Sequence, residues 1–162
     1  MDQVVRHATS ADRPLIVDLL RGFWGGTTVV AHGTLFDAAA LPALLSRRGD
    51  RVTGLLTYAI GLDGLEVVTL DAVQRHSGAG TALLSAAVRH AVAEGLGRIW
   101  LITTNDNVDG IRFYQRRGMR IVGINPGAVD ESRKIKPSIP EVGEYGIEIH
   151  DELVLERRLP SR

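Results

Sequence analysis

A glycine-rich turn between an apolar run and a helical run is the feature that most constrains this chain. Residues 65–70 are apolar and β-prone, residues 81–93 are rich in alanine and leucine, and Arg75, Gly78 and Gly80 lie between them. Glycine accepts backbone angles that other residues resist, so the main chain can approach a ligand closely. The first amides of a helix have no partner inside it and lie at the positive end of its dipole. The sequence therefore predicts a strand, turn and helix that bind a phosphate or pyrophosphate.

The turn lacks the residues of two common nucleotide motifs. A dinucleotide fingerprint needs a third glycine three residues after the second, but position 83 is leucine. A P-loop needs Gly-Lys and then Ser or Thr, but Gly80 is followed by Thr81 and Ala82. The spacing Arg-x-x-Gly-x-Gly instead resembles the pyrophosphate loop of the GNAT acyltransferases, which bind the pyrophosphate of acetyl-CoA on backbone amides.

A second motif follows the next apolar strand, residues 99–102. The GNAT pattern Asn-x-x-Ala-x-x-Phe-Tyr-x-x-x-Gly-Phe is matched in register by Asn107, Gly110, Phe113, Tyr114, Gly118 and Met119. Glycine replaces the usual alanine and methionine the usual phenylalanine, so both positions stay small or apolar. The two motifs together cover residues 65–124, and the chain resembles the GNAT N-acetyltransferase superfamily.

Composition restricts the function classes. A chain of 162 residues suits one domain over residues 1–162 with a sizeable core. Its 19 basic residues balance 19 acidic ones, so no net field attracts nucleic acid or an anionic membrane. The absence of cysteine removes thiolate metal sites and a cysteine nucleophile, and the scattered histidines show no metal-binding spacing. Without a long apolar run or a signal sequence, we expect a cytoplasmic protein without membrane or nucleic-acid partners.

Alternation and turn residues predict the other elements. Strands are expected over residues 3–7, 43–47, 51–60, 65–71, 99–102, 119–124 and 152–158. Helices are expected over residues 13–22 and 81–94, with a short helix starting near Asp109. Together with the resemblance, this order predicts an α/β GNAT fold with a mixed, mostly antiparallel central sheet and helices on both faces.

Residues 125–150 form a polar, turn-rich segment before the last predicted strand. A hairpin does not need so long a connection, and loops of this size are usually functional or mobile. The segment includes Arg133, Lys134, Lys136, Tyr145 and His150, which could recognise a polar acceptor. We predict a long loop that forms one wall of the acceptor pocket, with a solvated surface loop as the alternative.

Acetyl transfer from a thioester to an amine needs a neutral amine, stabilisation of the carbonyl oxygen and a proton for the departing sulfur. A phenol, with a pKa near 10, keeps its proton at neutral pH and can donate it to a thiolate. The resemblance implies that Tyr114 is the general acid and that Phe113 and Asn107 contact the cofactor. Tyr114 could instead only pack beside Phe113, and Asn107 could instead cap the short helix.

The resemblance also assigns cofactor contacts around the glycine turn. GNAT folds splay two parallel strands there, so the backbone of Leu70, Asp71 and Ala72 is expected to pair with the pantetheine arm. The pyrophosphate is expected on the loop residues Arg75, His76, Ser77, Gly78, Ala79, Gly80 and Thr81. The Arg75 side chain could equally form an ordinary salt bridge.

The general base is assigned to Glu66, because some family members place a carboxylate base on the strand before the cofactor loop. No local motif singles out one residue. Asp71, Asp106, His32 and His150 are therefore further candidates for the base.

The predicted function is an N-acetyltransferase that moves the acetyl group of acetyl-CoA to a primary amine of a small molecule. Transfer is expected to be direct, since no activated nucleophile for an acyl-enzyme is evident. A protein amine acetyltransferase and a non-catalytic acyl-CoA sensor or interaction module are the alternatives. A homodimer is left open, because many relatives dimerise.

Overall fold

The computed structural model describes residues 2–160, and their contacts divide the chain into two compact units. The described residues of the first unit are 2–29, 37–99 and 159–160, and those of the second are 30–36 and 100–158. The single domain over residues 1–162 stays a prediction. Each unit has its own strands and helices, which are described in turn.

The first unit contains four strands that are adjacent in the order β1, β4, β5, β6. Their bounds are Val4–His7, Ala43–Arg48, Arg51–Gly61 and Gly64–Ala72, and each neighbouring pair is antiparallel. Its helices are α1 (Arg13–Trp24) and α2 (Ala79–Ala93), with short 3-10 turns at Ser10–Asp12 and Ala38–Ala40. Helix α1 runs past the predicted end at Gly22 because Gly25, in the left-handed conformation, caps it.

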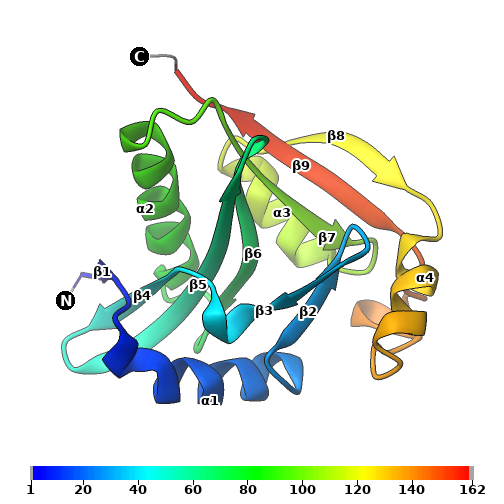
Figure 1. Cartoon of the computed structure of the whole chain (residues 1–162), viewed down its shortest axis with the longest axis horizontal. Coiled ribbons are helices and arrows are strands. Elements are labelled where there is room, and N and C mark those ends of the chain that lie inside the picture. The colour runs from blue at the N-terminus through cyan, green and yellow to red at the C-terminus, as the bar shows by residue number, and fades with distance from the viewer. Residues whose placement is uncertain (1, 161–162) are drawn as a thin grey trace. The chain divides into compact units, whose positions relative to one another are not determined.

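Helices cover both faces of this four-stranded sheet (Figure 1). A Cβ on Gly54 of β5 would lie 2.8 Å from Leu83 of α2, so this face packs against α2. The neighbouring residue Leu55 points the other way and pairs with Asp71 of β6, which accepts a hydrogen bond from Trp24 of α1. Leu55 is fully buried, which places the core on both sides of β5.

The second unit contains β7 (Arg98–Thr104), α3 (Val108–Arg116), β8 (Arg120–Asn125), α4 (Ala128–Ile135) and β9 (Glu152–Arg158). Strand β9 lies between β7 and β8 and pairs with β8 in antiparallel register. The bounds of β9 agree with the predicted strand. The short strands β2 (Thr28–Ala31) and β3 (Thr34–Asp37) form a sheet of their own, and β3 was not predicted.

The sequence predicted one long loop over residues 125–150, but the structure has a helix and a 3-10 turn within this segment. Helix α4 occupies residues 128–135, and a 3-10 turn, η3, covers Glu144–Gly146. Gly127 in the left-handed conformation precedes α4; Asp130 and Glu131 lie in its first turn, and basic residues lie in its last turn. This charge order complements the helix dipole, which stabilises a helix this short.

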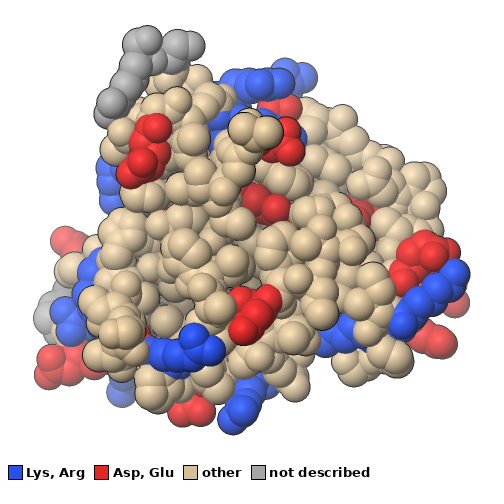
Figure 2. All heavy atoms as spheres, in the orientation of Figure 1, with Lys and Arg blue, Asp and Glu red and all other residues tan. Residues whose placement is uncertain are grey.

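Charged side chains of both signs are interspersed on the face shown in Figure 2, and neither sign gathers in one large patch. None of the helices within residues 2–160 has the length and apolar character that a membrane crossing requires. In the same part of the chain, no three His, Asp or Glu side chains are grouped to hold a metal ion.

Candidate active site

In the first unit, the glycine turn joins β6 to α2 as predicted. Gly78 is the N-cap of α2 and has a φ of 87°, a conformation that favours glycine. The Ala82 N–H makes the first helical hydrogen bond, to the Gly78 carbonyl at 3.0 Å. Residues 78–80 therefore present amides that the helix ladder does not use, although the Ala79 N–H lies 3.4 Å from Ser77 Oγ. The turn fits a bound pyrophosphate.

Strand β6 also carries two carboxylates. Glu66 is only 6% exposed. Asp71 is half-buried near the end of the strand, and Trp24 Nε1 donates a hydrogen bond of 2.7 Å to its Oδ2. Burial raises the pKa of Asp71 to about 6, and the Trp24 hydrogen bond partly offsets that rise. Asp71 is therefore ionised at neutral pH but holds its charge at a cost in free energy.

In the second unit, Asn107 is the N-cap of α3. Its Oδ1 accepts the Gly110 N–H at 3.2 Å, and its Nδ2 donates to Thr103 Oγ1 at 2.9 Å. A Cβ on Gly110 would lie too close to the Asn107 side chain in its present position, so alanine, which the motif usually has here, would require that side chain to shift. The structure thus shows the capping role that the sequence offered as an alternative. A contact of Asn107 with the cofactor stays a prediction.

Tyr114 lies on α3, half-buried beside Phe113, and the two ring centroids are 5.3 Å apart. The Arg117 guanidinium lies 3.8 Å from the centre of the Phe113 ring. The Tyr114 carbonyl accepts the N–H groups of Arg117 and Met119, which end the helix. These contacts fix the backbone from which the Tyr114 phenol projects.

Asn105, which follows β7, binds the backbone that leads into β9. Its Oδ1 accepts the N–H groups of His150 and Asp151, each at 3.0 Å, and its Nδ2 donates to the Glu148 carbonyl at 2.8 Å. One side chain thereby fixes three backbone groups more than 40 residues away in sequence. The sequence analysis missed this anchor.

Asp106 holds the same segment at another point. It is buried, and its Oδ2 accepts the Glu144 N–H at 3.0 Å while the Thr104 hydroxyl donates to its Oδ1. A Cβ on Gly143 would collide with Asp106, so glycine is required there. Next to it, the Tyr145 hydroxyl donates to Asp109 of α3 at 2.8 Å. Residues 141–151 are therefore fastened to the turn between β7 and α3.

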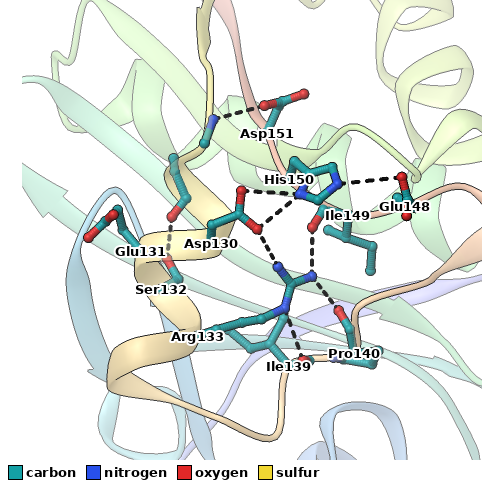
Figure 3. A network of polar contacts seen from close by, with 12 residues as sticks. Asp130, Glu131, Ser132, Arg133, Ile139, Pro140, Glu148, Ile149, His150 and Asp151 are labelled. Atoms are coloured by element: carbon teal, nitrogen blue, oxygen red, sulfur yellow. Dashed lines mark hydrogen bonds and ion pairs between the residues drawn. The ribbon is translucent and has the colours of Figure 1, made fainter.

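Arg133 of α4 joins the helix to the same segment (Figure 3). Its guanidinium donates to the carbonyls of Ile139, Pro140 and Ile149, and to Asp130 at 2.7 Å. The sequence shows that Arg133 is positively charged but does not reveal its partners, because most of them are backbone oxygens of an irregular stretch.

His150, a candidate base, forms an ion pair with Asp130. The two side chains are 2.9 Å apart, and Glu148 lies 3.7 Å from the other ring nitrogen (Figure 3). The hydrogen bond and the charge of Asp130 raise the pKa of His150. This arrangement favours the imidazolium and suits an ion pair better than a base.

Two more base candidates, His32 and Asp106, also have structural contacts. His32 lies between β2 and β3, and its backbone N–H donates to the Glu152 carboxylate at 3.2 Å. Its imidazole ring lies beside Phe36. Asp106 is occupied by the Glu144 amide and the Thr104 hydroxyl. The general base stays a prediction, and Glu66 and Asp71 are the two candidates on β6.

These features define a class: an α/β protein in which a glycine turn joins a strand to a helix N-terminus and a tyrosine lies on a short capped helix. Residues 18–119, more than half of the chain, match the acetyltransferase (GNAT) family. The chain belongs to this family and is an acyl-CoA-dependent N-acetyltransferase.

Two Bacillus subtilis proteins are similar to most of the chain. The uncharacterized protein YdhI is 37% identical over 145 residues, 88% of this chain and 90% of that protein. The uncharacterized protein YxbD is 34% identical over 148 residues, 91% of this chain and 93% of that protein.

Solved structures share the fold. An IAA acetyltransferase from Bacillus cereus is 20% identical with a TM-score of 0.74, covering 98% of this chain and 100% of its own. A Bacillus subtilis acetyltransferase in complex with CoA is 16% identical with a TM-score of 0.70 and the same coverage. The Escherichia coli ribosomal-protein-S18-alanine N-acetyltransferase has a TM-score of 0.70 at 11% identity, covering 99% of this chain and 96% of its own. The predicted fold class, family and type of enzyme are confirmed, and the site residues stay predictions.

Proposed function

We propose that this enzyme transfers the acetyl group of acetyl-CoA directly to a primary amine of a small molecule. The left-handed N-cap at Gly78, with the amides of residues 78–80 outside the helix ladder, is the observation that carries the cofactor assignment. The complex of the Bacillus subtilis acetyltransferase with CoA supports the same donor. The composition supports a cytoplasmic location.

The hydrogen-bonded segment of residues 141–151 supports a small-molecule acceptor. Asn105, Asp106 and Asp109 hold residues 141–151 against the turn that precedes α3, the helix of Tyr114. An ordered wall next to that helix suits a compact amine whose polar groups meet Tyr145 or the charged side chains of the segment. The fold itself does not choose the acceptor, and the Escherichia coli neighbour acts on a ribosomal protein.

When bound, acetyl-CoA supplies a thioester carbonyl that an amine can attack. Tyr114 holds a phenolic proton at neutral pH and gives it to the sulfur as the carbon–sulfur bond breaks. Glu66 accepts the proton that the amine loses as its nitrogen bonds to the carbonyl carbon. Backbone groups of Leu70, Asp71 and Ala72 orient the arm of the donor.

Asp71 is a second candidate base, because its pKa of about 6 lies nearer to neutrality than that of an exposed carboxylate. The variants Glu66→Gln and Asp71→Asn separate the two. If Glu66 is the base, Glu66→Gln loses about 10²-fold or more in turnover. Asp71→Asn then keeps most of the activity. The reverse pattern assigns the base to Asp71.

Ligand-dependent thermal stability tests the cofactor assignment. CoA at 100 times its dissociation constant is expected to stabilise the wild type by about 2.7 kcal/mol. Gly78→Val, which forces a β-branched residue into a positive φ, is expected to abolish that gain. A wild type that responds to NAD or ATP but not to CoA would contradict the assignment.

A panel of amines tests the acceptor class by free-thiol release from acetyl-CoA. Small primary amines are expected to support release, whereas peptides with free N-termini are not. Release with peptides alone would favour a protein acceptor. CoA binding without release for any amine would favour a sensor or interaction module.

A further inference from the structure

The carbonyl of Ser77, in the middle of the glycine turn, is held by two side chains from distant parts of the chain. Arg48 Nη2, at the end of β4, donates to this oxygen at 2.7 Å. Gln3 Nε2, just before β1, donates to the same oxygen at 3.2 Å. Neither residue belongs to the motif that predicted the turn.

Gln3 is itself oriented by a short chain of hydroxyl groups. Thr53 Oγ1 lies 2.5 Å from Gln3 Oε1 and 2.9 Å from Ser46 Oγ. The Thr53 hydroxyl donates to the Gln3 amide carbonyl, since an amide oxygen only accepts, and its contact with Ser46 Oγ holds the hydroxyl in place. Ser46 and Thr53 are buried. With its oxygen committed to Thr53, the Gln3 amide can only present its N–H groups to Ser77.

Because the peptide group is planar, the hydrogen bonds that fix the direction of the Ser77 carbonyl also fix the direction of the Gly78 N–H. The Ser77–Gly78 peptide bond is trans, so the N–H of Gly78 points away from the Ser77 carbonyl, and hence away from Arg48 and Gln3. Turning this peptide over would bring Gly78 from its φ of 87° into the negative range. It would also replace an N–H donor with a carbonyl oxygen on the side where an anion binds. An anion-binding loop needs the observed orientation.

We propose that Arg48 and Gln3 are positioning residues that hold the Ser77–Gly78 peptide with its N–H toward the pyrophosphate of acetyl-CoA. The inference rests on the proposed function, because the pyrophosphate is the ligand of this loop. Arg48 acts here as a hydrogen-bond donor to the backbone, and Gln3 performs the same task without a charge.

Gln3 makes the inference testable, because this uncharged side chain supports the Ser77 carbonyl without attracting the ligand by charge. Gln3→Met removes the donor while keeping side-chain length, and Arg48→Met removes the guanidinium donor while keeping an unbranched apolar side chain. Arg51→Met is a matched control, because Arg51 pairs with Arg48 across the β4–β5 turn and is also exposed. Calorimetric titration with CoA and with 3′-dephospho-CoA is the measurement.

We expect affinity for both ligands to fall about tenfold in Arg48→Met and about fivefold in Gln3→Met, from the net worth of a charged and a neutral hydrogen bond. Arg48→Lys should recover part of the loss, and Arg51→Met should bind within about twofold of wild type. In the ligand-free protein, the ¹⁵N–¹H signal of Gly78 should shift in Gln3→Met but not in Arg51→Met.

Three results would overturn the inference. Unchanged affinity in both Met variants, with a wild type that binds CoA, shows that the peptide needs no support. A loss in Arg48→Met that vanishes with 3′-dephospho-CoA shows that Arg48 contacts the 3′-phosphate instead. A wild type that binds neither ligand contradicts the proposed cofactor itself, and this titration distinguishes that failure from the other two.

Discussion

Replacing Asp71 with asparagine should stabilise the protein at alkaline pH and not at acid pH. Burial raises the pKa of Asp71 from 3.8 to about 6. At about 1.4 kcal/mol per unit, the folded state carries the ionised carboxylate at a cost of roughly 3 kcal/mol. The unfolded chain loses this proton near pH 4. The free energy of unfolding therefore falls as the pH rises from about 4 to 6, and the loss is complete above the folded pKa.

Asparagine removes the charge and keeps a carbonyl oxygen for the Trp24 N–H. Its own NH₂ group needs a partner in a half-buried site, which costs about 1 kcal/mol. Asp71→Asn is therefore expected to exceed the wild type by about 1 to 2 kcal/mol at pH 8. At pH 4.5 the wild-type carboxyl is protonated in the fold, and the variant should have no advantage.

Urea unfolding at the two pH values measures this difference. Asp50→Asn serves as the control for the loss of one carboxylate, because Asp50 is exposed in the turn between β4 and β5. A gain of the same size at both pH values, or a loss at pH 8, would refute the reasoning that burial of the charge raises the Asp71 pKa.

Three further predictions concern the second unit. Gly143→Ala should lower the free energy of unfolding by about 1 to 3 kcal/mol, because its Cβ would collide with Asp106; Gly22→Ala, whose Cβ has open space, should not. In Asp130→Asn, the NMR titration of His150 should move to lower pH, and an unchanged titration would contradict the pairing. In the wild type, the ion pair stabilises the fold fully below about pH 6.5, and this stabilisation is lost as the pH rises through the folded pKa of His150. Asp130→Asn should lack this pH-dependent stabilisation. Trimming residues 138–146 should impair acceptor use more than CoA binding, and normal kinetics in the trimmed enzyme would make the segment dispensable.

The sequence predicted the elements that have a strong local signal. Strand β9 has an apolar run, residues 153–155, between charged residues, so its bounds could be read from the sequence, although Glu152 at its start is buried. The glycine turn marked both the end of β6 and the start of α2, although α2 begins at Ala79, two residues before the predicted start. Helix α4 escaped prediction because much of its support is tertiary, from Arg133 to backbone oxygens of residues 139, 140 and 149.

The residues of the candidate site could be predicted where they belong to a sequence motif. They could not be predicted where their contact partners are distant in the sequence. Asn105 and Asp106 bind backbone amides that lie 38 to 46 residues away, and no local pattern names those partners. Polar residues after a strand do signal side chains that bind backbone groups, which is the one cue available. The same holds for Gln3 and Ser77, which are 74 positions apart.

The turnover of Tyr114→Phe tests the central claim most directly. The variant keeps the ring beside Phe113 and removes only the phenolic proton. With the amine identified by the panel, single-turnover thiol release is compared in wild type and variant, after CoA affinity and thermal stability show that the variant is folded. The account predicts a fall of about 10²-fold or more in the rate of release with little change in CoA affinity. An unchanged rate in the folded variant would contradict the role of Tyr114 as general acid.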